Sequence, residues 1–155
     1  MATMVGTQKD LLSLLAQLLE LDYDAIEAYK AAIQRLKDPS DKAQLGSFMR
    51  DHEQHVRELG DAIVQMGMRP PSGPDLKQVL TKGKVVLGSL MGDRTILLAM
   101  KTNEDDTNTA YERASKRDDL PQDLRAVVER CLQDERRHRA WMQQRIEVLN
   151  TAARP

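Results

Sequence analysis

Asp134-Glu135-Arg136-Arg137-His138 is the stretch that decides the fold, because a related stretch occurs earlier in the chain. Glu135 and His138 are three residues apart on a helical pattern, so both side chains lie on one face and can hold the same metal ion. The earlier stretch, 83 residues before, is Asp51-His52-Glu53-Gln54-His55, whose two histidines take the places of the Glu and the His. The chain therefore carries this helical face twice.

A second match strengthens the repeat. Ala28-Tyr29 and Ala110-Tyr111 are 82 residues apart, and an acid stands seven residues before each tyrosine, Asp22 in the first copy and Glu104 in the second. We interpret the chain as one helix hairpin written twice. Each copy contributes one acid from its first helix and a pair ending in x-x-His from its second.

Composition sets the class of protein. Of the 155 residues, 41% are hydrophobic, 30% charged and 3% aromatic, which favours one helical domain over a sheet protein. Lys plus Arg is 23 against 24 for Asp plus Glu, so no net charge attracts nucleic acid or an anionic membrane. The single Cys131 excludes an internal disulfide and fits a reducing cytosol. With no signal pattern or membrane-length apolar run, we expect a cytoplasmic protein.

Apolar residues recur at spacings of three and four in four segments, which predicts an all-α four-helix bundle. Short breaks such as Asp38-Pro39-Ser40-Asp41 predict antiparallel pairs, with the first helix ending near Lys37 and the second at Gly67. The proline- and glycine-rich stretch after Gly67 predicts a long crossover that contains a short extra helix over residues 75–90. The expected parts are an N-terminal segment 1–10, a bundle 11–150 made of repeat 1 (11–66), crossover 67–93 and repeat 2 (94–149), and a tail 151–155.

Six polar residues occupy positions that the apolar seams assign to the core: Asp22, His52, His55, Glu104, Glu135 and His138. A lone buried charge would cost several kcal/mol without a partner. A shared cation explains why they recur at matched places, and a set of three carboxylates and three imidazoles suits iron, manganese or zinc better than calcium or magnesium. The alternative is a metal-free network of buried salt bridges and hydrogen bonds.

Tyr29 and Tyr111 lie in the seams two turns from the single acids. We favour core packing with a bonded hydroxyl, and keep as the alternative a hydrogen bond to a metal ligand. Cys131 is expected to be a small buried hydrophobe.

These residues resemble the ferritin-like superfamily, particularly the rubrerythrin-like bundles and small bacterial ferritin-like proteins of unassigned activity. The resemblance covers residues 11–149 and implies a non-haem iron site, mononuclear or di-iron. In the family a carboxylate comes from helices one and three and a Glu-x-x-His from helices two and four. Asp22 departs from this pattern because it is shorter than the usual Glu. His52 stands where a bridging Glu is expected, and a neutral imidazole normally binds one ion.

The resemblance implies a function for each candidate. His52, His55 and His138 would ligate through nitrogen, Asp22 and Glu104 would be terminal carboxylates, and Glu135 would bridge. The implied activity is oxidation of ferrous iron by oxygen or peroxide, an oxidoreductase chemistry of the ferroxidase or peroxidase type. One cysteine cannot make a rubredoxin-type centre, so a peroxidase would need an external electron donor. The alternatives are a structural or stress-associated bundle, which fits a homo-oligomer, and a storage cage.

Overall fold

The computed structural model describes residues 3–73 and 90–153, and within these residues it is a bundle of four helices without strands. The helices are α1 (Leu11–Arg35), α2 (Pro39–Gln65), α5 (Asp93–Ser115) and α6 (Gln122–Ala152). The predicted all-α four-helix bundle is confirmed. The short helix predicted over residues 75–90 lies outside the described residues, apart from Leu90.

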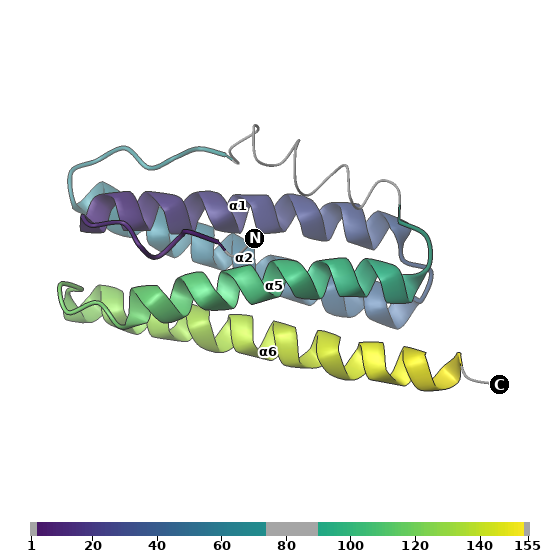
Figure 1. The fold of residues 1–155 in the computed structure, drawn as a ribbon. Helices are drawn as coiled ribbons and strands as arrows, with labels where there is room; N and C mark the ends of the chain where they lie inside the picture. The colour runs from purple at the N-terminus through teal and green to yellow at the C-terminus, as the bar shows by residue number, and fades with distance from the viewer. Residues whose placement is uncertain (1–2, 74–89, 154–155) are drawn as a thin grey trace.

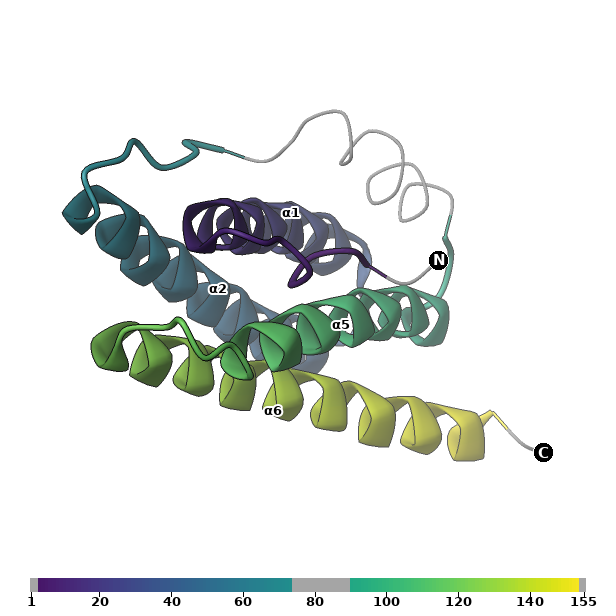
Figure 2. The same cartoon turned by 60° about the vertical axis from the view of Figure 1, so that its left-hand side comes forward.

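The helices form two antiparallel hairpins that pack against each other. α1 pairs with α2 and α5 pairs with α6, while α1 also packs on α5 and α2 on α6 (Figures 1 and 2). The chain leaves α2 at one end of the bundle and enters α5 at the opposite end (Figure 1). The end of α2 and the start of α5 therefore lie at opposite ends of the bundle, which is the arrangement that the predicted long crossover requires.

Local sequence signals set the helix ends. Asp10 caps α1 by accepting the backbone N–H of Ser13 at 2.9 Å, and Asp38 caps α2, with Pro39 in the first turn. After α2, Gly67 has φ +81°, and the backbone N–H of Met68 donates to Ile63 at 3.2 Å. This C-terminal motif favours glycine because it needs a left-handed residue.

Side chains also join the two hairpins at the end where α5 begins. Both carboxylate oxygens of Asp93 accept backbone N–H groups at 2.9 Å, one from Lys37 and one from Asp38 in the α1–α2 loop. On α6, Arg145 donates to the buried Asp41 at 2.8 Å. These contacts fix the position of one hairpin relative to the other.

The core consists of two apolar clusters separated along the bundle axis. One contains Leu14, Leu18 and Leu59 with the α5–α6 turn, and the other contains Phe48 and Met100 with neighbours near the opposite end. On each helix, the buried members of one cluster are separated in sequence from those of the other by a short stretch. The six polar seam residues occupy this middle layer, so apolar packing encloses them from both ends.

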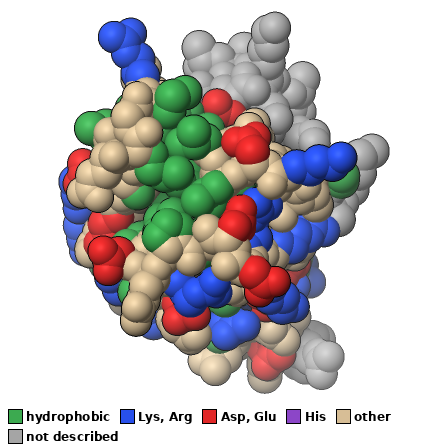
Figure 3. Space-filling view, turned by 90° about the vertical axis from the view of Figure 1, so that its left-hand side faces the viewer, with side chains coloured by type: hydrophobic (Ala, Val, Ile, Leu, Met, Phe, Trp, Pro, Cys, Tyr) green, Lys and Arg blue, Asp and Glu red, His purple; other side chains and the backbone are tan. Residues whose placement is uncertain are grey.

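The outer surface is mixed in character. A group of hydrophobic side chains is visible at the end where α1 begins and α2 ends (Figure 3), where Val64, Met66 and Met68 are among the exposed large hydrophobics. No histidine shows on this face (Figure 3). In the described residues, no helix has the length and apolar character needed to cross a membrane.

Candidate metal centre

The structure brings together all six polar seam residues predicted from the sequence. Each has between 0% and 2% of its surface exposed. One acid comes from α1, one from α5 and an i, i+3 pair from each of α2 and α6, because these positions face the bundle axis. The members of the set are Asp22, His52, His55, Glu104, Glu135 and His138. They form two overlapping groups, each with four ligand atoms within 4.8 Å of one another.

The first group gathers around Asp22. Asp22 Oδ1 lies 2.7 Å from His52 Nδ1 and 3.3 Å from His55 Nδ1. Glu135 Oε1 closes the group at 3.4 Å from His52 Nδ1 and 3.3 Å from His55 Nδ1. Two carboxylate oxygens and two imidazole nitrogens thus lie close enough together that they could hold one metal ion, and transition metals take such nitrogen and oxygen ligands.

The second group gathers around Glu104. Glu104 Oε1 is 3.6 Å from His52 Nε2, and Glu104 Oε2 is 3.6 Å from His138 Nδ1. Glu135 Oε2 is 3.9 Å from the same His138 nitrogen. These separations are too long for hydrogen bonds, although the four ligand atoms of the group lie within 4.8 Å of one another.

An outer pair of acids, which our sequence reasoning did not select, orients two of the histidines. His138 Nε2 donates to Asp51 at 2.9 Å, and His55 Nε2 donates to Asp134 at 3.1 Å. Each bond crosses between α2 and α6, and Arg137 donates to both acids, at 2.8 and 2.9 Å. Carboxylates in this position fix the ring so that Nδ1 points inward. The signal was available in the sequence, since Asp51 and Asp134 are themselves 83 residues apart.

The two tyrosines also make crossed contacts. The Tyr29 hydroxyl donates to Glu104, and the Tyr111 hydroxyl donates to Asp22. Both rings are fully buried. Each tyrosine therefore packs in the core with its hydroxyl bonded, and the partner is the single acid of the other hairpin. On α5, Thr107 Oγ1 adds a contact to Glu104 Oε2 at 3.3 Å.

Four buried atoms of the set have no hydrogen-bond partner in the described part of the chain. They are His52 Nε2, His138 Nδ1 and both carboxylate oxygens of Glu135. Buried polar atoms are rarely left unsatisfied, and a carboxylate with neither oxygen bonded is costly to bury. All four atoms face the two groups described above. The donor set and its unsatisfied atoms therefore fit a bound divalent cation.

Electrostatics of the ion-free site show how strongly its members interact. Burial alone would lower the pKa of His52, but the Glu135 carboxylate and the bond to Asp22 raise it well above the ordinary histidine value. Burial acts to raise the pKa of Glu104, yet the neighbouring rings of His138 and His52 hold it well below the ordinary value. Without an ion, the attraction between the rings and the carboxylates opposes the cost of burying them, and a divalent cation would supply positive charge to the same carboxylates.

Glu135 and Asp134 are neighbours in sequence with opposite shifts. Burial and repulsion from Glu104 raise the pKa of Glu135 despite the attraction of His52. Burial would also raise the pKa of Asp134, but its hydrogen bonds with His55 and Arg137 lower it to about 2. Asp134 is thus ionised at neutral pH, as an acceptor for the ring N–H of His55 must be.

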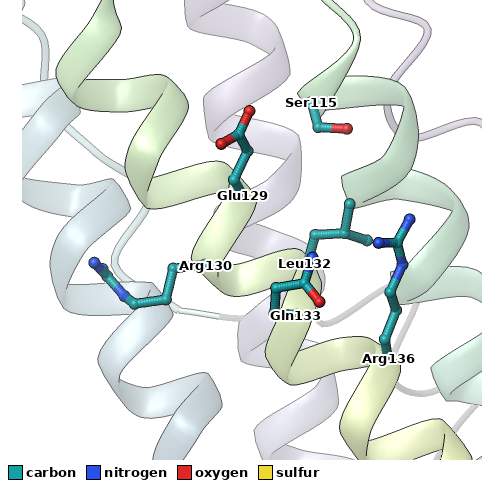
Figure 4. Close-up of a pocket in the computed structure, with 6 residues that line it drawn as sticks. All are labelled: Ser115, Glu129, Arg130, Leu132, Gln133 and Arg136. Carbon is teal, nitrogen blue, oxygen red and sulfur yellow. The ribbon is translucent and has the colours of Figure 1, made fainter.

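A surface groove of about 440 Å³ runs along α6 beside the end of α5 (Figure 4). Its lining residues are Ser115, Glu129, Arg130, Leu132, Gln133 and Arg136. None of these belongs to the six, which are buried in the bundle.

Comparison with known proteins identifies the family. The chain belongs to the family described as a domain of unknown function, DUF2383, whose model matches residues 10–117. The match spans the first hairpin and α5 but ends before α6, which supplies Glu135 and His138. No curated protein matches the chain.

Two solved structures are similar in fold. One is a dodecameric thioferritin, the bacterioferritin-related protein from Bacteroides fragilis, with TM-score 0.72, 12% identity, and coverage of 96% of this chain and 93% of that one. The other is a conserved hypothetical protein from Mycobacterium tuberculosis, with TM-score 0.70, 13% identity, and coverage of 84% and 92%. Together with the two helix hairpins, these likenesses show that the chain has the ferritin-like fold that its sequence predicted.

Proposed function

We propose that this protein binds divalent metal at the six residues of the middle layer, with iron as the native metal. The observation that carries the proposal is the set of four unsatisfied buried atoms on Glu135, His52 and His138, which face one another inside an apolar bundle. Mixed imidazole and carboxylate ligands suit iron, and manganese and zinc are the alternatives. The resemblance to non-haem iron bundles favours the same choice.

The proposed activity is oxidation of ferrous iron by oxygen or peroxide. Iron at the centre would supply the one-electron redox chemistry, and ferrous iron would also be the substrate. Asp22 and Glu104 would hold it as terminal carboxylates, and Glu135 presents one oxygen to each group. The two tyrosines orient those terminal carboxylates through their hydroxyl groups.

The protein's other contribution is to exclude water and fix ligand geometry. The apolar clusters on either side of the centre leave the six side chains no more than 2% exposed. A dry site strengthens every charge interaction within it. Asp51 and Asp134 hold the ring N–H groups of His138 and His55, which keeps the inner nitrogens free for a cation.

A metal-free structural bundle is the second candidate function. Its specific support is that carboxylates and imidazoles are close enough to form ion pairs, as between His52 and Asp22 at 2.7 Å. In such a network every buried oxygen should have a donor. Both oxygens of Glu135 lack one, so we favour the metal-binding function.

The test is ferrous loading of untagged full-length protein under anaerobic conditions, followed by metal analysis and then by exposure to oxygen or peroxide. We expect one or two ions per chain and a ferric absorbance that appears with the oxidant. Fewer than about 0.1 ion per chain would contradict metal binding at these ligands. Retained iron with no oxidant-dependent change would leave metal binding and remove the oxidase proposal.

Two partners belong to the same proposal. A peroxidase cycle would draw electrons from an external donor, because the chain has one cysteine and no rubredoxin-type centre. A homo-oligomer is favoured by the exposed Val64, Met66 and Met68 near the end of α2, and the similar thioferritin is dodecameric. Sedimentation analysis of the native protein should show a species larger than the 17.5 kDa chain, and a monomer at all concentrations would contradict it.

A further inference from the structure

His52 lies between the two ligand groups and offers one ring nitrogen to each. We propose that His52 joins two metal ions, binding one through Nδ1 and the other through Nε2, in the place where a carboxylate bridge is expected for this fold. This inference rests on the proposed metal-binding function. In this arrangement the histidine that departs from the Glu-x-x-His pattern is itself the bridge between two metal ions.

The two nitrogens of His52 point toward different neighbours. Nδ1 lies 2.7 Å from Asp22 Oδ1 and 3.4 Å from Glu135 Oε1, within the first group. Nε2 lies 3.6 Å from Glu104 Oε1 within the second group and has no hydrogen-bond partner among the described residues. A single imidazole cannot place both nitrogens around one ion, so each nitrogen serves its own group.

The ring is held in this position from several sides. It is fully buried, and its centroid lies 5.3 Å from the Tyr29 ring, 5.4 Å from the His55 ring and 5.2 Å from the His138 ring. The enclosing rings come from α1, α2 and α6. A turn of His52 that would move one nitrogen out of its group is therefore resisted by packing.

Glu135 is divided between the groups in the same way as His52. Its Oε1 lies near the histidine nitrogens of the first group, and its Oε2 lies 3.9 Å from His138 in the second. These two residues are the ones that both groups share. Each of the remaining four ligands serves one group alone, so two ion positions joined by His52 and Glu135 account for all six side chains.

The proposed arrangement also balances in charge and protons. Binding an ion through each nitrogen requires the ring to lose its N–H protons, and these leave to the buffer as the ions enter. The ring then carries one negative charge, as the carboxylate it replaces would. No oxidant or further reactant is needed for this step.

The length of the ring predicts the ion spacing. Two-metal sites commonly hold their ions about 3.5–4 Å apart. Two ions on opposite nitrogens of one imidazole must lie further apart than that, and Glu135 can then contact both by giving one oxygen to each. The spacing therefore separates ions joined through the His52 ring from ions held close by carboxylates alone, without any measurement of activity.

The test compares wild type, His52→Glu, His52→Gln and the control Glu53→Gln, each loaded with Co²⁺ and studied by metal analysis and X-ray absorption. Wild type and the control should bind two ions per chain with no cobalt–cobalt scattering at about 3.5–4 Å. His52→Glu should keep two ions and gain that short vector. His52→Gln lacks the imidazole ring and cannot give one ring nitrogen to each ion. The number of bound ions should therefore fall from two to one per chain at the same cobalt concentration.

Several results would overturn the proposal. One ion per wild-type chain, or two ions at the short spacing, would exclude a bridging His52 and leave metal binding intact. Two ions retained by His52→Gln would exclude it in the same way. Wild type with no bound cobalt and no bound iron would contradict the proposed function itself. Far-UV circular dichroism tests whether each variant is folded. If a variant does not fold, the ion count and the X-ray absorption spectrum of the wild type decide the question.

Discussion

Glu135 has the most demanding environment of any residue in the centre, since both of its oxygens are buried and unbonded in the described part of the chain. Replacing Glu135 by Ala should reduce bound iron from one or two ions per chain to a trace, because it removes the one carboxylate common to both groups. The matched control is Glu53→Gln, whose side chain is not in either group. Metal analysis after anaerobic loading measures both, and equal iron in the two variants would show that the assignment is wrong.

Asp134 tests the outer contacts at the same scale. Asp134→Asn removes the charge that accepts the His55 ring N–H at 3.1 Å and should weaken metal binding by about 10- to 100-fold. Competition with a chelator of known affinity measures the change. The exposed Asp118→Asn in the α5–α6 loop is the control, and an affinity for Asp134→Asn equal to that of the control would argue that the His55 contact has no part in binding.

The inner and outer residues differed in how far the sequence could predict them. Asp22, Glu104 and the histidines interrupt apolar seams, so their burial follows from periodicity alone. The bonds of Asp51 and Asp134 join residues 87 and 79 positions apart, and they exist because α2 packs against α6. The packing of α2 against α6 is a property of the assembled bundle, and the sequence of either helix alone does not predict it.

At the scale of elements, the turn and capping chemistry explains the helix ends well. We expected the first helix to end near Lys37, and α1 ends at Arg35 because Asp38 is used as the cap of α2. The end of α2 before Gly67 follows from the positive φ at that glycine. The link from Asp93 to the α1–α2 loop was not predicted, since it depends on how the second hairpin meets the first.

Asp93 therefore provides a prediction about how the elements hold together. Asp93→Ala removes two hydrogen bonds to the backbone of Lys37 and Asp38 and should lower the free energy of unfolding by about 1–3 kcal/mol. Urea denaturation followed by circular dichroism measures it. Asp118→Ala, an exposed loop change, should have almost no effect, and an equal midpoint for the two variants would count against this role of Asp93.

At the scale of the whole molecule, the centre links metal to stability because all four helices contribute to it. Metal at about a hundred times its dissociation constant should raise the free energy of unfolding by about 2.7 kcal/mol. For a chain of this length that corresponds to a Tm higher by about 5–10 °C. Differential scanning calorimetry with and without a chelator measures the shift. Glu135→Ala should show none, and a wild-type Tm that ignores both metal and chelator would speak for the metal-free bundle.

The ferritin-like arrangement was predictable because the sequence carries a duplicated helix hairpin with polar residues in its apolar seams. Few other arrangements bury the apolar seams and the polar residues of both hairpins together. What the duplication could not reveal is that the contacts of the two tyrosines with the single acids, and of Asp51 and Asp134 with the histidines, all cross to the other hairpin. Tyr29 bonds the acid of α5, and Tyr111 bonds the acid of α1. Separating the hairpins would break the contacts that orient the ligands, so the centre belongs to the whole bundle.

Anomalous diffraction at the iron edge, from crystals of the wild-type chain loaded with ferrous iron, tests the central claim most directly. The account predicts anomalous density in the middle layer, within bonding distance of Glu135, His138 and His55, and its loss in Glu135→Ala crystals grown in the same way. Density only at the surface, or none in a well-loaded crystal, would contradict the claim that these buried residues hold a metal.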